Sequence, residues 1–185
     1  MSRVVYYAAA TLDGYIAAPD DTIDWLTSYE GRPLGEDVEP AAGGYDEFYE
    51  RVGALVMGSV TYEWILEHAS WPYAGKRAWV MSSRDLPALE GEDVRVVSGS
   101  VTELFDEMAA SAGDRVLWVV GGGNVASQFA DAGLLNEVIV TVVPVVIGEG
   151  KPLLERPIAS APMRLTGALP RSNGMVELRY ELTEP

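Results

Sequence analysis

The feature that most constrains the fold is the alternation of short, almost continuously apolar runs with segments of helical pattern. The apolar runs occupy residues 3–10, 54–58, 77–83, 93–98, 115–121 and 137–144. Such runs are typical of strands that are covered on both faces, as in parallel sheets. Helical patterns lie between them at residues 45–52, 61–68, 101–112 and 124–133. The sequence therefore predicts an α/β fold with a central sheet and flanking helices.

The C-terminal part of the chain has a different pattern. Residues 163–169 and 175–182 alternate between apolar and polar side chains, and a cluster of Pro, Ser, Asn and Gly separates them. This pattern predicts an antiparallel hairpin at one edge of a mixed, mostly parallel sheet. The segments 11–44 and 144–162 have no assigned structure, and loops of this length in a compact domain are often functional.

Composition excludes several classes of protein. The chain has 185 residues, 48% of them hydrophobic, which favours one domain over residues 1–185 with a sizeable core. It has no cysteine and a single histidine, His68, so thiolate metal sites, histidine-rich metal sites and histidine triads are not predicted. We therefore expect no metal site.

The net charge of the chain limits the kinds of partner that it can bind. A net charge of −15, from 28 acidic and 13 basic residues, repels nucleic acid and anionic membranes. The N-terminal sequence does not resemble a signal peptide, and no apolar run reaches about 18 residues. We expect a soluble, cytoplasmic protein whose partner is a small molecule, without binding to nucleic acid or membrane.

A glycine-rich turn is the main candidate for ligand binding. In WVVGGGNVAS, Gly121, Gly122 and Gly123 follow an apolar run and precede a helical segment. Backbone N–H groups at such a helix start bind anions, including phosphates. A turn that needs glycine only for close packing is the alternative.

Two nucleotide-binding motifs fit this turn poorly. A P-loop would require Gly-Lys-Ser/Thr, but the glycines run into Asn124 and Val125. Gly121, Gly123 and Ala126 satisfy the Rossmann pattern G-x-G-x-x-A, yet no acidic residue follows the next strand before Glu149.

Four sequence blocks resemble a known family. They are TLDGYIA (11–17), VMGSVTYE (56–63), VMSS (80–83) and VVGGGNVASQF (119–129), the last running on to VVPVVIGEGKPLL (142–154). In this order they resemble the dihydrofolate-reductase-like superfamily. Within it they are similar to the reductase domain at the C-terminus of the bifunctional deaminase-reductase of riboflavin biosynthesis, the RibD C-terminal domain family. The chain looks like a stand-alone member, and the resemblance implies a dihydrofolate-reductase-like fold.

The resemblance implies an NADPH site at the strand ends. The glycine turn, which in the superfamily contains a cis peptide bond between adjacent glycines, would contact the pyrophosphate, and a second helix start would lie near the phosphates. Family members commonly carry Arg where this chain has Ser59. The residues implied for cofactor binding are Ala9, Trp25, Gly58, Ser59, Thr61, Ser82, Ser83, Arg84, Gly121, Gly122, Gly123, Asn124 and Val125. Of these, Ser82, Ser83 and Arg84 match the position of a 2′-phosphate site, where a guanidinium suits bidentate contacts.

The resemblance also implies an activity. An NADPH-dependent oxidoreductase of this type transfers a hydride to a small heterocyclic substrate. The substrate would be pyrimidine-like, as in 5-amino-6-(5-phosphoribosylamino)uracil reduction, or pterin-like, as in dihydrofolate reduction. The catalytic candidates are Asp13 and Asp46, and the substrate-binding candidates are Asp24 and Thr141. The family further implies a homodimer.

Two alternatives remain open at this stage. One is a non-catalytic nucleotide-binding module of the same fold, which the absence of the family's arginine at Ser59 favours. The mobile-loop residues Asp13 and Trp25 favour an enzyme, because a carrier has little need of a lid over the nicotinamide. The other alternative is a Rossmann-type enzyme, which would prefer NADH and needs an acidic ribose ligand.

Overall fold

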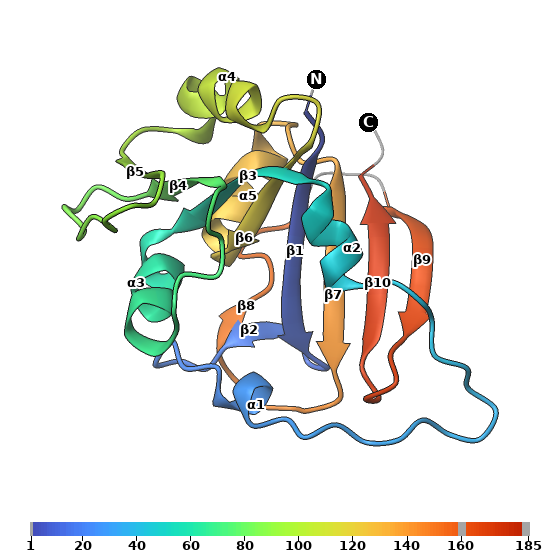
Figure 1. Cartoon of the computed structure of the whole chain (residues 1–185). Coiled ribbons are helices and arrows are strands. Elements are labelled where there is room, and N and C mark those ends of the chain that lie inside the picture. Colours follow the sequence, from blue (N-terminus) through green and yellow to red (C-terminus); the bar gives the residue numbers. More distant parts are fainter. Residues whose placement is uncertain (1, 159–161, 183–185) are drawn as a thin grey trace.

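The computed structural model describes residues 2–158 and 162–182, and its main feature is a single eight-stranded sheet (Figure 1). The strand order is β5-β4-β3-β6-β1-β7-β10-β9. All neighbours from β5 to β7 are parallel, whereas β10 is antiparallel to both β7 and β9. The strands are β1 (Val4–Thr11), β3 (Val52–Gly58), β4 (Arg77–Met81), β5 (Val94–Val97), β6 (Val116–Gly121), β7 (Glu137–Val143), β9 (Arg164–Pro170) and β10 (Val176–Glu181).

Helices cover both faces of this sheet. They are α2 (Tyr45–Glu50), α3 (Ser59–His68), α4 (Val101–Ala112) and α5 (Gly123–Asp131), whereas the short helix α1 (Asp24–Thr27) has no buried residue. On one face, Met108 of α4 and Phe129 of α5 pack against Tyr6 of β1 and its neighbours. On the other face, Phe48 of α2 and Tyr62 of α3 pack against the side chains that alternate with these. Because the central strands are covered twice, they are apolar at nearly every position.

The predicted fold class is confirmed: a mixed, mostly parallel sheet with flanking helices and an antiparallel C-terminal hairpin, β9–β10. Predicted element boundaries agree with the structure to within about two residues, a usual uncertainty at element ends. The two unassigned segments contain the short strands β2 (Tyr15–Ala17) and β8 (Lys151–Pro152), which pair with each other. Sequence patterning missed them because each strand is too short to show alternation. Within the described residues, no helix is long and apolar enough to cross a membrane.

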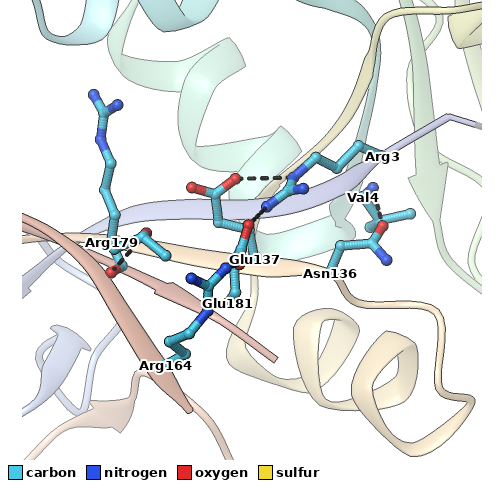
Figure 2. A network of polar contacts seen from close by, with 8 residues as sticks. Arg3, Val4, Asn136, Glu137, Arg164, Arg179 and Glu181 are labelled. Atoms are coloured by element: carbon cyan, nitrogen blue, oxygen red, sulfur yellow. Dashed lines mark hydrogen bonds and ion pairs between the residues drawn. The ribbon is translucent and has the colours of Figure 1, made fainter. Parts of the chain in front are cut away.

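Ionic contacts attach the hairpin to the parallel strands at the edge opposite the cavity described below. Arg3 contacts Glu137 at the start of β7 (3.1 Å) and Glu181 at the end of β10 (2.6 Å), as Figure 2 shows. Arg164, at the start of β9, also pairs with Glu181. These contacts connect β1, β7, β10 and β9, which are far apart in the sequence.

Candidate functional site

A cavity of about 1040 Å³ lies where the carboxyl ends of β3, β6, β1 and β7 meet the beginning of β10. Ends of parallel strands share one edge of the sheet, so loops from distant parts of the sequence converge there. Many of the predicted site residues line this cavity. They are Ala9, Gly58, Ser59, Thr61, Gly121, Gly122, Gly123, Asn124, Val125 and Thr141.

Each glycine of the turn has a structural reason, which is either close packing or backbone conformation. Gly122 has φ +84°, which favours glycine. A Cβ on Gly123 would stand 2.5 Å from the carbonyl oxygen of Pro152, and one on Gly121 would stand 3.0 Å from Thr61 Oγ1. Close packing therefore explains Gly121 and Gly123, while Gly122 is required by backbone conformation.

The glycine turn differs from the family expectation in one respect. All peptide bonds among the described residues are trans. The expectation of a cis bond between adjacent glycines is therefore wrong for this structure, in which Gly122 has a positive φ.

Two helix starts lie side by side at this turn. A Cβ on Gly122 would stand 3.9 Å from the backbone nitrogen of Gly58, the residue that precedes α3. Neither α3 nor α5 has a side-chain hydrogen bond at its N-cap. Their first N–H groups are thus available to a ligand, and the helix dipoles favour an anion there. This arrangement fits the diphosphate of a dinucleotide.

Polar side chains from the segment after β7 also line the cavity near this turn. Lys151 lines the cavity and lies 3.6 Å from Asp21. Asn124 donates a hydrogen bond to Glu155 at 2.6 Å. Lys151 was not selected by the sequence analysis; it precedes Pro152, whose carbonyl oxygen packs against Gly123, and its strand β8 pairs with β2.

The predicted 2′-phosphate residues lie beyond the rim of the cavity. Ser82, Ser83 and Arg84 follow Met81, which lines it. Arg84 forms two hydrogen bonds with Glu63 of α3, at 3.0 and 2.6 Å, and these raise the pKa of its guanidinium. The two guanidinium nitrogens of Arg84 that could bind a phosphate are therefore already bonded to the Glu63 carboxylate, and a phosphate would have to displace Glu63.

The predicted acidic residues do not line the cavity. Asp13 accepts hydrogen bonds from the backbone N–H groups of Gly148 (2.8 Å) and Ile147 (3.2 Å). A hydrogen bond from Thr11 and these backbone contacts lower its pKa, so Asp13 connects the loop after β1 to the loop after β7. Asp24 and Asp46 are exposed residues in the first turns of α1 and α2.

Trp25 also lies outside the cavity lining, although its neighbours Ile23 and Leu26 belong to it. Its indole N–H is buried and has no hydrogen-bond partner among the described residues. The segment after β1 therefore contributes the apolar side chains of Ile23 and Leu26 to the cavity lining. Trp25, which the sequence analysis selected, does not line the cavity.

Sequence analysis missed the polar groups at the opposite end of the cavity. Tyr7, Arg171 and Glu177 line it, and Glu177 is 1% exposed. The Tyr7 hydroxyl donates to Glu177 at 2.8 Å, and Arg171 forms an ion pair with Glu177 at 2.8 Å. Burial raises the pKa of Glu177, but hydrogen bonds from Tyr7, Arg179 and Arg171 outweigh it, so the pKa is lowered overall. Sequence analysis could not assign Glu177 to the cavity, because the pairing of β10 with β7 is what brings Glu177 opposite Thr141.

An aromatic wall joins the two ends of the cavity. Tyr7, Tyr45, Tyr73 and Trp118 line it. The ring centroid of Tyr45 lies 5.8 Å from that of Trp118 and 6.2 Å from that of Tyr7. Flat, polarizable side chains of this kind suit a planar ring.

The strand order, the hairpin and the glycine turn at the strand ends define a dihydrofolate-reductase-like protein. Residues 2–176 match the family model of the RibD C-terminal domain. The chain belongs to this family.

Known proteins agree with this assignment. The chain is 30% identical over 166 residues to the uncharacterized protein YwjB of Bacillus subtilis, covering 89% of this chain and 90% of YwjB. It is 28% identical to a putative riboflavin biosynthesis protein from Shewanella, whose crystal structure superposes with a TM-score of 0.80 over 98% of this chain and 99% of that one. The dihydrofolate reductase of Enterococcus faecalis, solved with NADP(H), is 16% identical, with a TM-score of 0.63 over 98% of this chain and 97% of that one. This last similarity concerns the fold alone.

Proposed function

We propose that this protein is an NADPH-dependent reductase of a small heterocyclic substrate. The observation that carries the proposal is the pair of uncapped helix starts at Gly58 and Gly122, which present N–H groups to one side of a large cavity. The family match and the NADP(H) complex of the Enterococcus faecalis enzyme support the choice of cofactor.

The residues available for the cofactor are those at the glycine turn. The N–H groups around Gly122, Gly123 and Gly58 would hold the diphosphate, and Lys151 would offset part of its charge. When bound, NADPH supplies the hydride, and the protein orients the acceptor ring. The aromatic wall and the polar end at Tyr7, Thr141 and Glu177 would hold that ring.

The two alternatives make different predictions. A Rossmann-type enzyme does not fit this strand order, because its glycine turn follows the first strand of the sheet unit, whereas here the turn follows β6. A non-catalytic module would bind NADPH without oxidising it in the presence of any ring acceptor.

Cofactor titration tests the proposal. NADPH and NADH are titrated into the protein by isothermal calorimetry, and we expect NADPH to bind more tightly. Gly122→Ala should weaken NADPH binding by about tenfold or more, since a methyl group would separate the diphosphate from the backbone.

A matched control separates binding from backbone strain. Gly133, at the end of α5, also has a positive φ, +67°, and lies in open space. Gly133→Ala should cost similar stability and leave NADPH affinity unchanged. Equal loss of affinity in both variants, or no binding of NADPH by the unaltered protein, would contradict the proposed cofactor site.

A further inference from the structure

Both cations that line the cavity are already paired with carboxylates. The charged side chains of the described lining are Asp21, Lys151, Glu155, Arg171 and Glu177. Lys151 lies 3.6 Å from Asp21, and Arg171 lies 2.8 Å from Glu177. Three carboxylates thus stand against two cations, so the described lining has an excess of negative charge.

Arg171 is the cation at the polar end of the cavity, and the protein itself uses its donors. Arg171 Nη1 donates to the carbonyl oxygens of residues 41, 42 and 43, at 3.3, 3.3 and 3.1 Å. Its Nη2, which forms the ion pair with Glu177, is inaccessible to solvent. Gly44 packs against the same guanidinium, with a Cβ position 3.6 Å from Cζ. A phosphate or carboxylate group could bind these nitrogens only by displacing Glu177 or the loop segment.

Glu177 resists such displacement because its negative charge is buried. It is 1% exposed, and it accepts hydrogen bonds from the Tyr7 hydroxyl at 2.8 Å and from Arg179 Nε at 2.7 Å. Its pKa is lowered overall, so the carboxyl group is ionised at neutral pH. A ligand that drew Arg171 away would leave this charge partly uncompensated, which is strongly unfavourable for a buried group.

Lys151 is the cation at the other end of the cavity, and in the proposed function it faces the diphosphate of the cofactor. A bound dinucleotide would add its own negative charge to the excess already present in the lining. Like charges repel more strongly in a partly enclosed site than in water. A second anionic group in the cavity is therefore disfavoured.

We propose that the acceptor of this reductase carries no phosphate or carboxylate group, and that Glu177 determines this selectivity by keeping Arg171 paired. The substrate class is then a neutral heterocycle, which excludes phosphoribosyl pyrimidines. That this ligand is the hydride acceptor rests on the proposed function, whereas the charge selectivity of the cavity is measurable without turnover.

Ligand pairs that differ by one anionic group test this inference. Uridine is compared with uridine 5′-monophosphate, and pterin with pterin-6-carboxylate. Binding is measured by calorimetry at low ionic strength, with and without saturating NADP⁺. We expect the neutral member of at least one pair to bind about fivefold or more tightly, and the preference to increase with NADP⁺.

A salt series distinguishes repulsion of charge from steric exclusion. Raising the ionic strength from about 20 mM to about 300 mM shortens the range of electrostatic interactions. The preference for the neutral member should then decrease, whereas a preference caused by the bulk of the anionic group would not change.

Glu177→Gln tests the role of the carboxylate by a gain of binding. The substitution keeps the shape of the side chain and removes the charge that holds Arg171. We expect the anionic member of a pair to bind about fivefold or more tightly than it binds to the unaltered protein, while the neutral member changes less. The ligand pairs and the salt series use the unaltered protein, so they test the inference even where this variant is unstable.

Glu67→Gln is the matched control for net charge. Glu67 is exposed on α3 and does not line the cavity, and no ion pair joins it to an arginine among the described residues. The substitution removes one negative charge without freeing a guanidinium. It should leave the affinities of both members unchanged.

Arg32 provides a test at the mouth of the cavity. It lines a small depression together with Ser172 and Asn173, which also line the cavity. Arg32→Ala should leave the preference for the neutral member unchanged. A preference for the anionic member that Arg32→Ala abolishes would place a phosphate site there and overturn the inference.

The outcomes separate this inference from the proposed function. Equal or tighter binding of the anionic member in every pair, failure of both neutral rings to bind, or no gain in a folded Glu177→Gln variant would overturn the inference. Failure of NADPH to bind, with the preference for neutral rings intact, would instead contradict the proposed cofactor.

Discussion

At the scale of single residues, ion pairs decide which charges a ligand can use. Arg84 and Arg171 are both conspicuous cations near the cavity, but each is held by a carboxylate, Glu63 and Glu177 respectively. The two pairs differ in exposure: Arg84 and Glu63 are largely exposed, whereas Glu177 is buried. An exposed pair is worth at most about 1 kcal/mol and can exchange partners, while breaking a buried one leaves an uncompensated charge.

This difference leads to a prediction for Glu63. Glu63→Gln should free Arg84 and increase the preference for NADPH over NADH by up to about fivefold, which corresponds to about 1 kcal/mol. Arg84→Ala should reduce the same preference. Calorimetric titration with both cofactors measures the ratio, and Glu67→Gln on the same helix serves as the control. If the ratio of NADPH to NADH affinity is unchanged in both variants, Arg84 does not contribute to 2′-phosphate binding.

At the scale of elements, the C-terminal hairpin does more than close the edge of the sheet. Its strand β10 carries Glu177 into the cavity wall at one end and Glu181 into the ionic contacts with Arg3 at the other. The pKa values of both carboxyl groups are lowered, Glu181 through hydrogen bonds from Arg3 and Arg164. The attachment of the hairpin therefore depends on ionised carboxylates.

The pH dependence of stability follows from these shifts. A carboxyl group with a lowered pKa in the folded state binds fewer protons than in the unfolded chain, so its contribution is present above the unfolded value of about 4.5. This contribution is lost as the pH falls through the folded pKa. We expect the free energy of unfolding, measured in urea, to fall as the pH drops below about 4.5.

A substitution tests the origin of this effect. Glu177→Gln should lower stability at neutral pH and flatten the decrease at acidic pH, because one titrating group is lost. Glu67→Gln should leave the acidic decrease unchanged. Identical acidic slopes in Glu177→Gln and the unaltered protein would show that Glu177 does not contribute.

At the scale of the whole molecule, the fold gathers a site from nearly the entire chain. The cavity lining extends from Tyr7 on β1 to Glu177 on β10, at opposite ends of the sequence. Parallel strands make this possible by directing their carboxyl ends to one edge, while the antiparallel strand β10 begins at that same edge.

The family resemblance predicts a homodimer. Light scattering should give twice the chain mass of 20.0 kDa at micromolar concentration. A dilution series tests whether the dimer dissociates. A mass of one chain throughout the series would contradict this prediction.

The sequence alone was sufficient for the fold class and for the glycine turn that lines one end of the cavity. Continuous apolar runs require burial on both faces, and the glycine turn has a local signature, so the parallel strands and the residues Gly121 to Val125 could be predicted. Individual acidic residues could not be assigned in this way. Asp13 and Asp46 occupy suitable segments, but only the structure shows that neither side chain lines the cavity.

Alternation in β10 was misleading about the other end of the site. Polar Glu177 is 1% exposed and apolar Val176 is 36% exposed, the reverse of what a half-buried strand predicts. The reason lies in pairing with β7, which sets Glu177 beside Thr141 and within reach of Tyr7. Local pattern determined the elements of this protein and its glycine turn, because these depend on neighbours in the sequence. Only the tertiary structure decided which charges are compensated and which polar side chains line the cavity, because those contacts join different elements, such as Glu63 of α3 with Arg84 and Tyr7 of β1 with Glu177 of β10.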